Sequence, residues 1–274
     1  MRKNIGKILL AAALLMILTL GCLGVSASAG GVDPTVTVRF RDVNGAAITM
    51  SIVAGDTVWL GRNGGTLAFS ADGTSVVLDG LDLNSMSADP NAESVFDFPD
   101  TVNHLTLKDA ADLSFFDANT CSLFKFRHTG AVTMDGNATI DFGSYIVSGQ
   151  KDITAAGSLI FSKLNIALSL MTKPMSFAAD RGITIDGCAI VKNGSSGNLT
   201  LLSKGPVTIT DSWVDLWYIE AAALNVSRSK VTVDSSMSYQ SGVELGALHV
   251  GDLSPDGFLD ITAGSGQYAL HLTS

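Results

Sequence analysis

The sequence has little cysteine, little proline and few basic residues. Cysteine occurs three times and proline six times in 274 residues. Three cysteines are too few for a disulfide scaffold, and the scarcity of proline leaves the turns to Asp-Gly, Asn-Gly and Ser-Gly pairs. With 17 Lys and Arg against 26 Asp and Glu, the formal net charge is −9. This acidic balance argues against a nucleic-acid partner, which would require a basic patch.

The first 29 residues have the pattern of a secretory signal peptide. Three basic residues precede an apolar run from Ile8 to Leu20, and Ala27-Ser28-Ala29 is typical of a cleavage site. Cleavage after Ala29 removes those basic residues and shifts the formal net charge from −9 to −12. The run is too short to span a membrane, so we expect a secreted or cell-surface bacterial protein with no span after processing.

The three cysteines have separate interpretations. Cys22 leaves lipid anchoring open, although Thr19 stands where lipoprotein signals have leucine. Cys121 and Cys188 remain after processing and lie 67 residues apart. They are expected either to pair in an oxidising exterior or to be two buried free thiols, and the sequence does not choose between these.

The plainest repetition lies between residues 181 and 233. Three runs share one form: ITIDGCAI from Ile183, VTITDSWV from Val207 and LNVSRSKV from Leu224. Each has an apolar–polar–apolar strand, a short polar or glycine turn and a second apolar run. Self-similarity at this period is the signature of a solenoid. Similar strand starts recur at intervals of 17 to 30 residues, at Val76, Leu105, Val132, Ile153, Ile183, Val207, Leu224 and Leu248.

A segment with simple alternation precedes the repeats. Val36, Val38 and Phe40 alternate with polar residues, and Asn44-Gly45 is a hairpin turn signal. Because an open solenoid end exposes strand edges and core, we interpret residues 30–65 as an N-terminal β segment with a short hairpin that caps the solenoid. The solenoid is assigned to residues 66–274. The strand pattern at its end leaves open that the sequence is a fragment of a longer protein.

The rung pattern resembles the right-handed parallel β-helix of the pectate-lyase-like superfamily. It is also similar to secreted carbohydrate-binding or adhesin-like β-solenoids of bacteria. The segments that carry the resemblance are Ser75–Leu83, Gly246–Val250 and Leu259–Gly266, and it covers most of residues 66–272. It implies an all-β fold of stacked coils, in which inward residues such as Ile183 and Val207 lie on their counterparts in the next coil.

The chain lacks the catalytic motifs of the enzymes in that superfamily. The polygalacturonase-like branch carries Asn-Thr-Asp, Asp-Asp, Gly-His-Gly and Arg-Ile-Lys in order, and none of these occurs here. Arg127, Arg181 and Arg228 are isolated, and Asp211 with Asp215 is a carboxylate pair expected by chance in an Asp-rich chain. No nucleophile–base constellation can be assembled, so we expect no catalysis. A divergent polysaccharide lyase or glycoside hydrolase stays open as an alternative.

The run DSWVDLWY, which ends at Tyr218, is the main candidate for ligand binding. If Val214 and Leu216 face the core, alternation points Trp213, Asp215 and Trp217 outward. Two exposed indoles around a carboxylate favour stacking on sugar rings, with Asp215 accepting hydrogen bonds from hydroxyl groups. The alternative is that a loop covers the indoles, or that a slipped register turns them inward.

Aspartates recur just after the first strand of several repeats, at Asp79, Asp135, Asp186 and Asp211. Turn chemistry explains this pattern, because aspartate accepts backbone hydrogen bonds and tolerates unusual dihedral angles. A calcium-binding edge is the second interpretation, since carboxylate oxygens are preferred calcium ligands. No nonapeptide calcium repeat occurs, so calcium is kept only as an alternative cofactor.

These patterns together predict a non-catalytic β-helix protein at the cell surface or outside the cell. Its expected partner is a polysaccharide or another surface ligand, in an adhesin-like role. A purely structural surface stalk is the third interpretation, beside the enzyme.

Overall fold

The computed structural model describes residues 34–41, 44–60, 65–83, 89, 91–109, 111–112, 122–137, 139–141, 153–169, 175–193, 199–235, 243–251, 257–263 and 270–272. The predicted signal peptide, Cys22 and Cys121 lie outside these residues. The chain divides into two compact units between Asp33 and Pro34, and every described residue belongs to the second unit.

The described part of the chain is all-β. It contains strands and no helix, and hence no helix that could cross a membrane. Its strands form one sheet of 18 strands and one of seven. The first five strands are β1 (Thr35–Arg41), β2 (Ala47–Val53), β3 (Thr57–Leu60), β4 (Gly65–Phe69) and β5 (Ser75–Asp79).

From β5 onward the strands fall into three rows, which the chain visits in turn. Row one holds β6 (Ser94–Phe98), β9 (Ser122–Phe126), β12 (Ile153–Ala155), β15 (Met175–Ala179), β18 (Leu199–Ser203) and β25 (Leu270–Leu272). Row two holds β5, β7 (His104–Lys108), β10 (Ala131–Gly136), β13 (Ser158–Ser162), β16 (Gly182–Asp186) and β19 (Pro206–Thr210). The long strands β21 (Tyr218–Ser227) and β23 (Val243–Val250) run through both rows.

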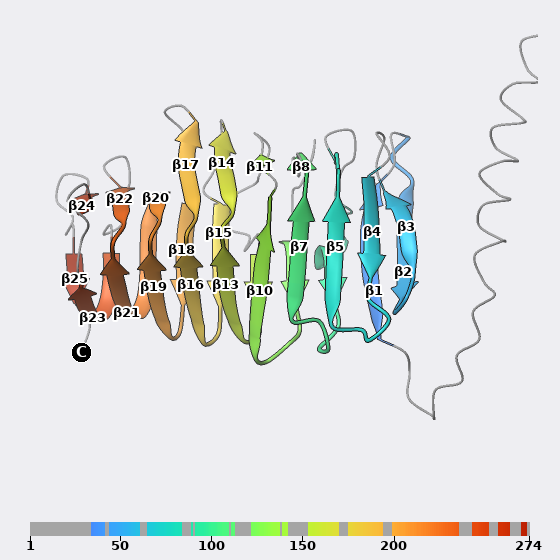
Figure 1. Cartoon of the computed structure of the whole chain (residues 1–274), viewed down its shortest axis with the longest axis horizontal. Helices are drawn as coiled ribbons and strands as arrows, with labels where there is room; N and C mark the ends of the chain where they lie inside the picture. Colours follow the sequence, from blue (N-terminus) through green and yellow to red (C-terminus); the bar gives the residue numbers. More distant parts are fainter. Residues whose placement is uncertain are drawn as a thin grey trace, which may run out of the picture. The chain divides into compact units, whose positions relative to one another are not determined.

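Row three is the seven-stranded sheet. It consists of β8 (Ala111–Asp112), β11 (Thr139–Asp141), β14 (Asn165–Ser169), β17 (Ala189–Asn193), β20 (Trp213–Leu216), β22 (Lys230–Ser235) and β24 (Phe258–Ala263). In all three rows each strand pairs in parallel with its counterpart one coil later, so the fold is solenoid-like. Within residues 34–274 the colours therefore follow the sequence from coil to coil (Figure 1).

The predicted repeats pair in register. Ile183 lies opposite Val207, and Val207 lies opposite Leu224. Two of the eight predicted strand starts do not align with their neighbours. Leu105 lies opposite Met134 rather than Val132, and Ile153 belongs to row one, where it pairs with Phe124 and Phe177. Leu159 takes the row-two position instead. Ile153-Thr154-Ala155 has the apolar–polar–apolar form of the repeats, whereas Leu159-Ile160-Phe161 has an apolar residue at the middle position, so the pattern favours the segment that lies in row one.

The core lies between the rows. In rows two and three buried residues alternate with outward ones, as in β19 and β20, whereas all five residues of β6 in row one are buried. In row two Ile183, Ile185, Val207 and Ile209 are buried, as the rung pattern predicts. Row one adds aromatic rings that stack from coil to coil. The ring centroids of Phe98 and Phe126 lie 4.6 Å apart on successive row-one strands, and Phe177 of row one stacks on Phe161 of row two with the centroids 4.7 Å apart. Stacked or tilted aromatic pairs add to the free energy of burial.

The N-terminal segment adds antiparallel strands at the first coil. β1 and β2 form a hairpin with Asn44-Gly45 between them, and Gly45 has a φ of 79°. β3, β4 and β5 follow one another in antiparallel pairs. β1 also pairs with β6. The segment thus covers the β6 edge with a paired strand, which prevents edge-to-edge association at that strand.

Candidate functional site

The turn between rows two and three positions the candidate site. It has two residues in each of three consecutive coils: Gly187-Cys188, Asp211-Ser212 and Arg228-Ser229. The first residue is left-handed each time, with φ of 63°, 49° and 45°. The second residue is buried. A left-handed residue bends the chain sharply within a single step, so row three begins at a fixed place in each coil.

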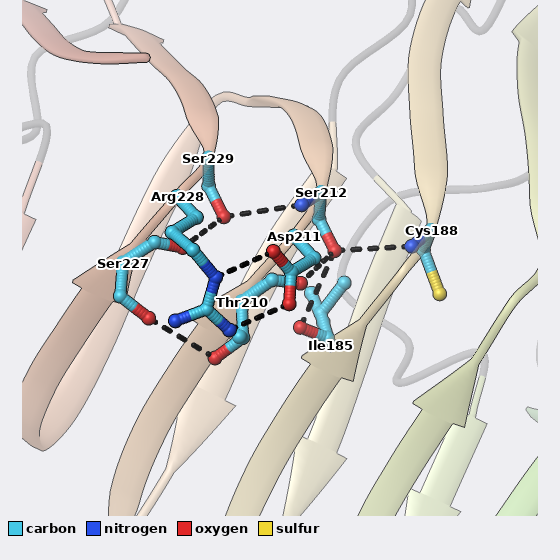
Figure 2. A network of polar contacts seen from close by, with 8 residues as sticks. All are labelled: Ile185, Cys188, Thr210, Asp211, Ser212, Ser227, Arg228 and Ser229. Carbon is cyan, nitrogen blue, oxygen red and sulfur yellow. Dashed lines mark hydrogen bonds and ion pairs between the residues drawn. The ribbon is translucent and has the colours of Figure 1, made fainter. Parts of the chain in front are cut away.

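Two buried serines hold successive turns together (Figure 2). The N–H of Cys188 donates to Oγ of Ser212 over 3.0 Å, and the N–H of Ser212 donates to Oγ of Ser229 over 3.1 Å. Each hydroxyl donates within its own turn, Ser212 to the carbonyl of Thr210 at 2.6 Å and Ser229 to that of Ser227 at 2.7 Å. These hydrogen bonds form a serine ladder, which fixes the position of β20 relative to β17 and β22, the strands that follow the two neighbouring turns.

Cys188 occupies the serine position one coil earlier. Its thiol is free and buried, and burial raises the thiol pKa. Cys121, the other cysteine considered for a disulfide, lies outside the described residues.

On the outer side of the turns, Arg228 and Asp211 form a bidentate ion pair. Nε donates to Oδ1 over 2.7 Å, and Nη2 donates to Oδ2 over 2.6 Å. The hydrogen bonds from Arg228 lower the pKa of Asp211. Figure 2 shows the pair beside the serine ladder, at the edge from which β20 and β22 start.

Trp213 is the first residue of β20 and lies on its outer face. It is 52% exposed, whereas Val214 and Leu216 are fully buried, as the alternation predicts. Nζ of Lys230 lies 5.8 Å from the centroid of the Trp213 ring. This distance is within the range of a cation–π interaction.

A shallow groove of about 350 Å³ lies beside this indole. Its wall includes Trp213, Lys230, Asn165 and the Asp211–Arg228 pair, and Gly187 and Ala189 line the coil before Trp213. Ala189 lies opposite Trp213 in the register of row three. Because these two residues are small, one flank of the indole stays open.

Asp215 and Trp217 differ from Trp213 in their environment. Asp215 is half-buried, and its Oδ2 accepts the N–H of Lys192 over 3.1 Å. Trp217 is also half-buried and lies at the bend between β20 and β21, where its N–H donates to the carbonyl of Leu199 over 2.8 Å. All three predicted residues alternate with buried ones, and of the three Trp213 is the exposed one.

The four predicted calcium-edge aspartates lie in different surroundings. Asp79 is opposite Lys108, Asp186 is opposite Thr210, and Asp211 is bound to Arg228. Asp135 accepts the hydroxyl of Thr106 at 2.9 Å, and its other oxygen lies 2.9 Å from Nε2 of His104. Within the described residues, no group of three or more His, Cys, Asp or Glu side chains gathers at a possible metal site. The calcium hypothesis stays a prediction.

A second, larger groove of about 740 Å³ lies over row one, and the sequence did not indicate it. Its lining includes Lys125, Thr154, Ala178, Leu202 and Lys204. Nζ of Lys204 lies 2.7 Å from Oδ1 of Asp180. The small outward residues in β12 and β15 were the available signal in the sequence. They indicate a groove only once the register of row one places them side by side.

Comparisons with known proteins found no relative of this chain. No family model, curated protein or solved structure matches the chain.

Proposed function

We propose that this chain is a secreted or cell-surface right-handed parallel β-helix that binds a glycan without catalysing a reaction, in an adhesin-like role. The observation that carries the proposal is Trp213, a half-exposed indole on a fixed strand beside an open groove. The right-handed form is supported by the general rule that parallel crossover connections are right-handed.

The groove offers the two kinds of contact that sugar recognition needs. The open flank of Trp213 provides an apolar, polarisable face for the C–H face of a sugar ring. Asn165, Asp211 and Lys230 line the same groove and provide hydrogen-bonding groups for sugar hydroxyls. Small-molecule sites commonly combine an apolar wall with a few such polar groups.

The carboxylates near Trp213 support a binding role over hydrolysis. Glycoside hydrolysis uses two carboxyl groups, one of them acting as acid and the other as base or nucleophile. Asp211 is held by both hydrogen bonds of Arg228, and Asp215 accepts a backbone N–H. Both carboxylates are therefore engaged in structural contacts.

The test is binding of the mature chain to a panel of soluble and insoluble polysaccharides, with calcium and with a chelator. Trp213→Ala is expected to weaken retention strongly on the glycan that the wild type binds. Trp59→Ala is the matched control, because Trp59 is 72% exposed on β3, away from the groove. Retention of the folded Trp213→Ala variant at the wild-type level, or no binding to any glycan, contradicts the proposal and favours a structural stalk.

A further inference from the structure

Row three carries a second exposed aromatic residue in line with Trp213. The register places Lys230 opposite Trp213, and Phe258 opposite Lys230 on the next coil. Phe258 is 42% exposed at the start of β24, and its N–H donates to the carbonyl of Ser229 over 3.0 Å. An indole, an ammonium group and a phenyl ring thus follow one another on the outer face of three consecutive coils.

We infer that the glycan lies across the coils, along the solenoid axis, and that Trp213 and Phe258 are two ring-stacking subsites with Lys230 between them. This inference rests on the proposed function and specifies its ligand. The ligand is an extended oligosaccharide, and its chain crosses β20, β22 and β24.

The spacing of the row sets the length of the ligand. Adjacent strands lie about 4.8 Å apart, so two coils separate Trp213 from Phe258 by roughly 10 Å. One sugar ring cannot lie on both aromatic rings, and a chain of several sugars can. The other direction, along β20 toward Trp217, ends at a half-buried indole in the bend before β21.

Lys230 is suited to contact the ligand between the two subsites. Its ammonium group is held near the indole by the cation–π contact and keeps N–H donors for sugar oxygens. Lys204 provides a matched comparison, because it is an exposed lysine at the other groove, where it pairs with Asp180.

The test is calorimetric titration with a length series of oligosaccharides cut from the glycan that binds. Trp213→Ala is expected to weaken binding at every length. Phe258→Ala should leave the shortest binding oligosaccharide unaffected and weaken longer ones by about tenfold, a usual loss for a truncated aromatic anchor. Phe258→Tyr keeps an aromatic ring and should bind with the wild-type affinity. Lys230→Gln should weaken binding, whereas Lys204→Gln should not. Circular dichroism checks that each variant is folded.

The outcomes separate this inference from the proposed function. If Trp213→Ala loses binding but Phe258→Ala matches the wild type at every length, the orientation across the coils is wrong and the glycan-binding proposal stands. If neither variant changes the affinity, the site and the orientation are both wrong. If no glycan binds the wild type, both proposals fail together.

Discussion

Two arginine–aspartate pairs have the same geometry and different surroundings. Asp97 accepts hydrogen bonds from Nε and Nη2 of Arg127 over 2.7 and 2.6 Å. The two hydrogen bonds from Arg228 to Asp211 have the same lengths. The Asp97 side chain is only 8% exposed, against 48% for Asp211. Asp97 also lies 3.5 Å from Nη1 of Arg39. The first pair therefore ties β1, β6 and the turn after β9 together, whereas the second lies on the surface.

The environment of Asp97 determines its titration. Burial acts to raise its pKa, but the hydrogen bonds and charge of Arg127, with the charges of Arg39 and Lys125, outweigh burial and lower the pKa. A carboxyl group with a lowered folded pKa stabilises the fold above its unfolded pKa of about 3.9. That stability is lost as the pH falls through the folded value, so the pair matters at neutral pH and fails in acid.

We expect Asp97→Asn to destabilise the fold at pH 7 by about 1–2 kcal/mol, near the low end for charge-assisted hydrogen bonds because Arg127 is half exposed. Urea unfolding followed by circular dichroism at pH 7 and below pH 4 measures the difference, which should shrink in acid. Asp211→Asn is the matched control and should change stability less, because its pair is exposed. Equal effects of the two variants at pH 7 would show that burial does not strengthen the Asp97 pair.

At the residue scale, the sequence predicts orientation within a strand better than neighbours between strands. Trp213 points outward as expected, because period-two alternation depends only on the strand itself. Trp217 continues the alternation between two buried neighbours, but it is half-buried rather than exposed, at the bend before β21. Lys230 and Phe258 were missed as neighbours of Trp213, because they follow it by 17 and 45 residues and only the register brings them into one row.

Among the elements, the turn ladder has the clearest energetic consequence. Ser212→Ala removes the acceptor of the Cys188 N–H in a buried turn. An unsatisfied buried donor costs about 1–3 kcal/mol, and we expect a loss of stability of that size in urea unfolding. Ser227→Ala is the control, since its half-buried hydroxyl makes only a 3.4 Å contact with Thr210. A Ser212→Ala variant as stable as the control would mean that the ladder contributes nothing to the fold.

At Gly157 and Gly205 the turn between rows one and two leaves no room for a Cβ, whereas Arg181 stands at this position in the coil between them. A Cβ on Gly205 would lie 1.6 Å from the carbonyl oxygen of Arg181, and one on Gly157 would lie 1.7 Å from that of Gly130. The N–H of Ala222 donates to the Gly205 carbonyl over 3.1 Å, so the coils before and after this turn are both in close contact with it.

We therefore expect Gly205→Ala to cost about 1–3 kcal/mol or more, because successive coils must separate to admit the methyl group. Thermal unfolding gives the measurement. The neighbouring Lys204→Gln changes an exposed side chain and should leave the midpoint nearly unchanged. A Gly205→Ala midpoint equal to that of Lys204→Gln would contradict the close stacking of these turns.

The elements were predictable as strands but not as rows. Ile153-Thr154-Ala155 of row one has the apolar–polar–apolar form of the repeats, whereas row two of the same coil carries Leu159-Ile160-Phe161, so the pattern favours the strand of the wrong row. The row of a strand depends on the length of the connection before it and on the coil beneath it. Neither quantity is encoded in the strand itself, which is why the start at Ile153 was misplaced while Ile183, Val207 and Leu224 were aligned correctly.

At the scale of the whole molecule, coil stacking follows from the composition. Repeated short strands cannot bury their apolar faces alone, so neighbouring coils must cover them, which the sequence predicted from the repeats. The groove beside Trp213 could not be predicted, because it depends on small residues at Gly187 and Ala189 being next to a large one in the following coil. The candidate site thus depends on the register between coils, whereas the all-β class follows from the alternation within each strand.

The most direct test of the account is the fluorescence of Trp213 in a Trp59→Phe/Trp217→Phe variant, titrated with a glycan that the wild type binds. The account predicts a saturable blue shift, because stacking removes water from the half-exposed indole, with a midpoint that matches the calorimetric affinity. A parallel variant that keeps only Trp59 should show no shift. Unchanged Trp213 emission while calorimetry still reports binding would contradict the account, because the ligand would then bind elsewhere on the chain.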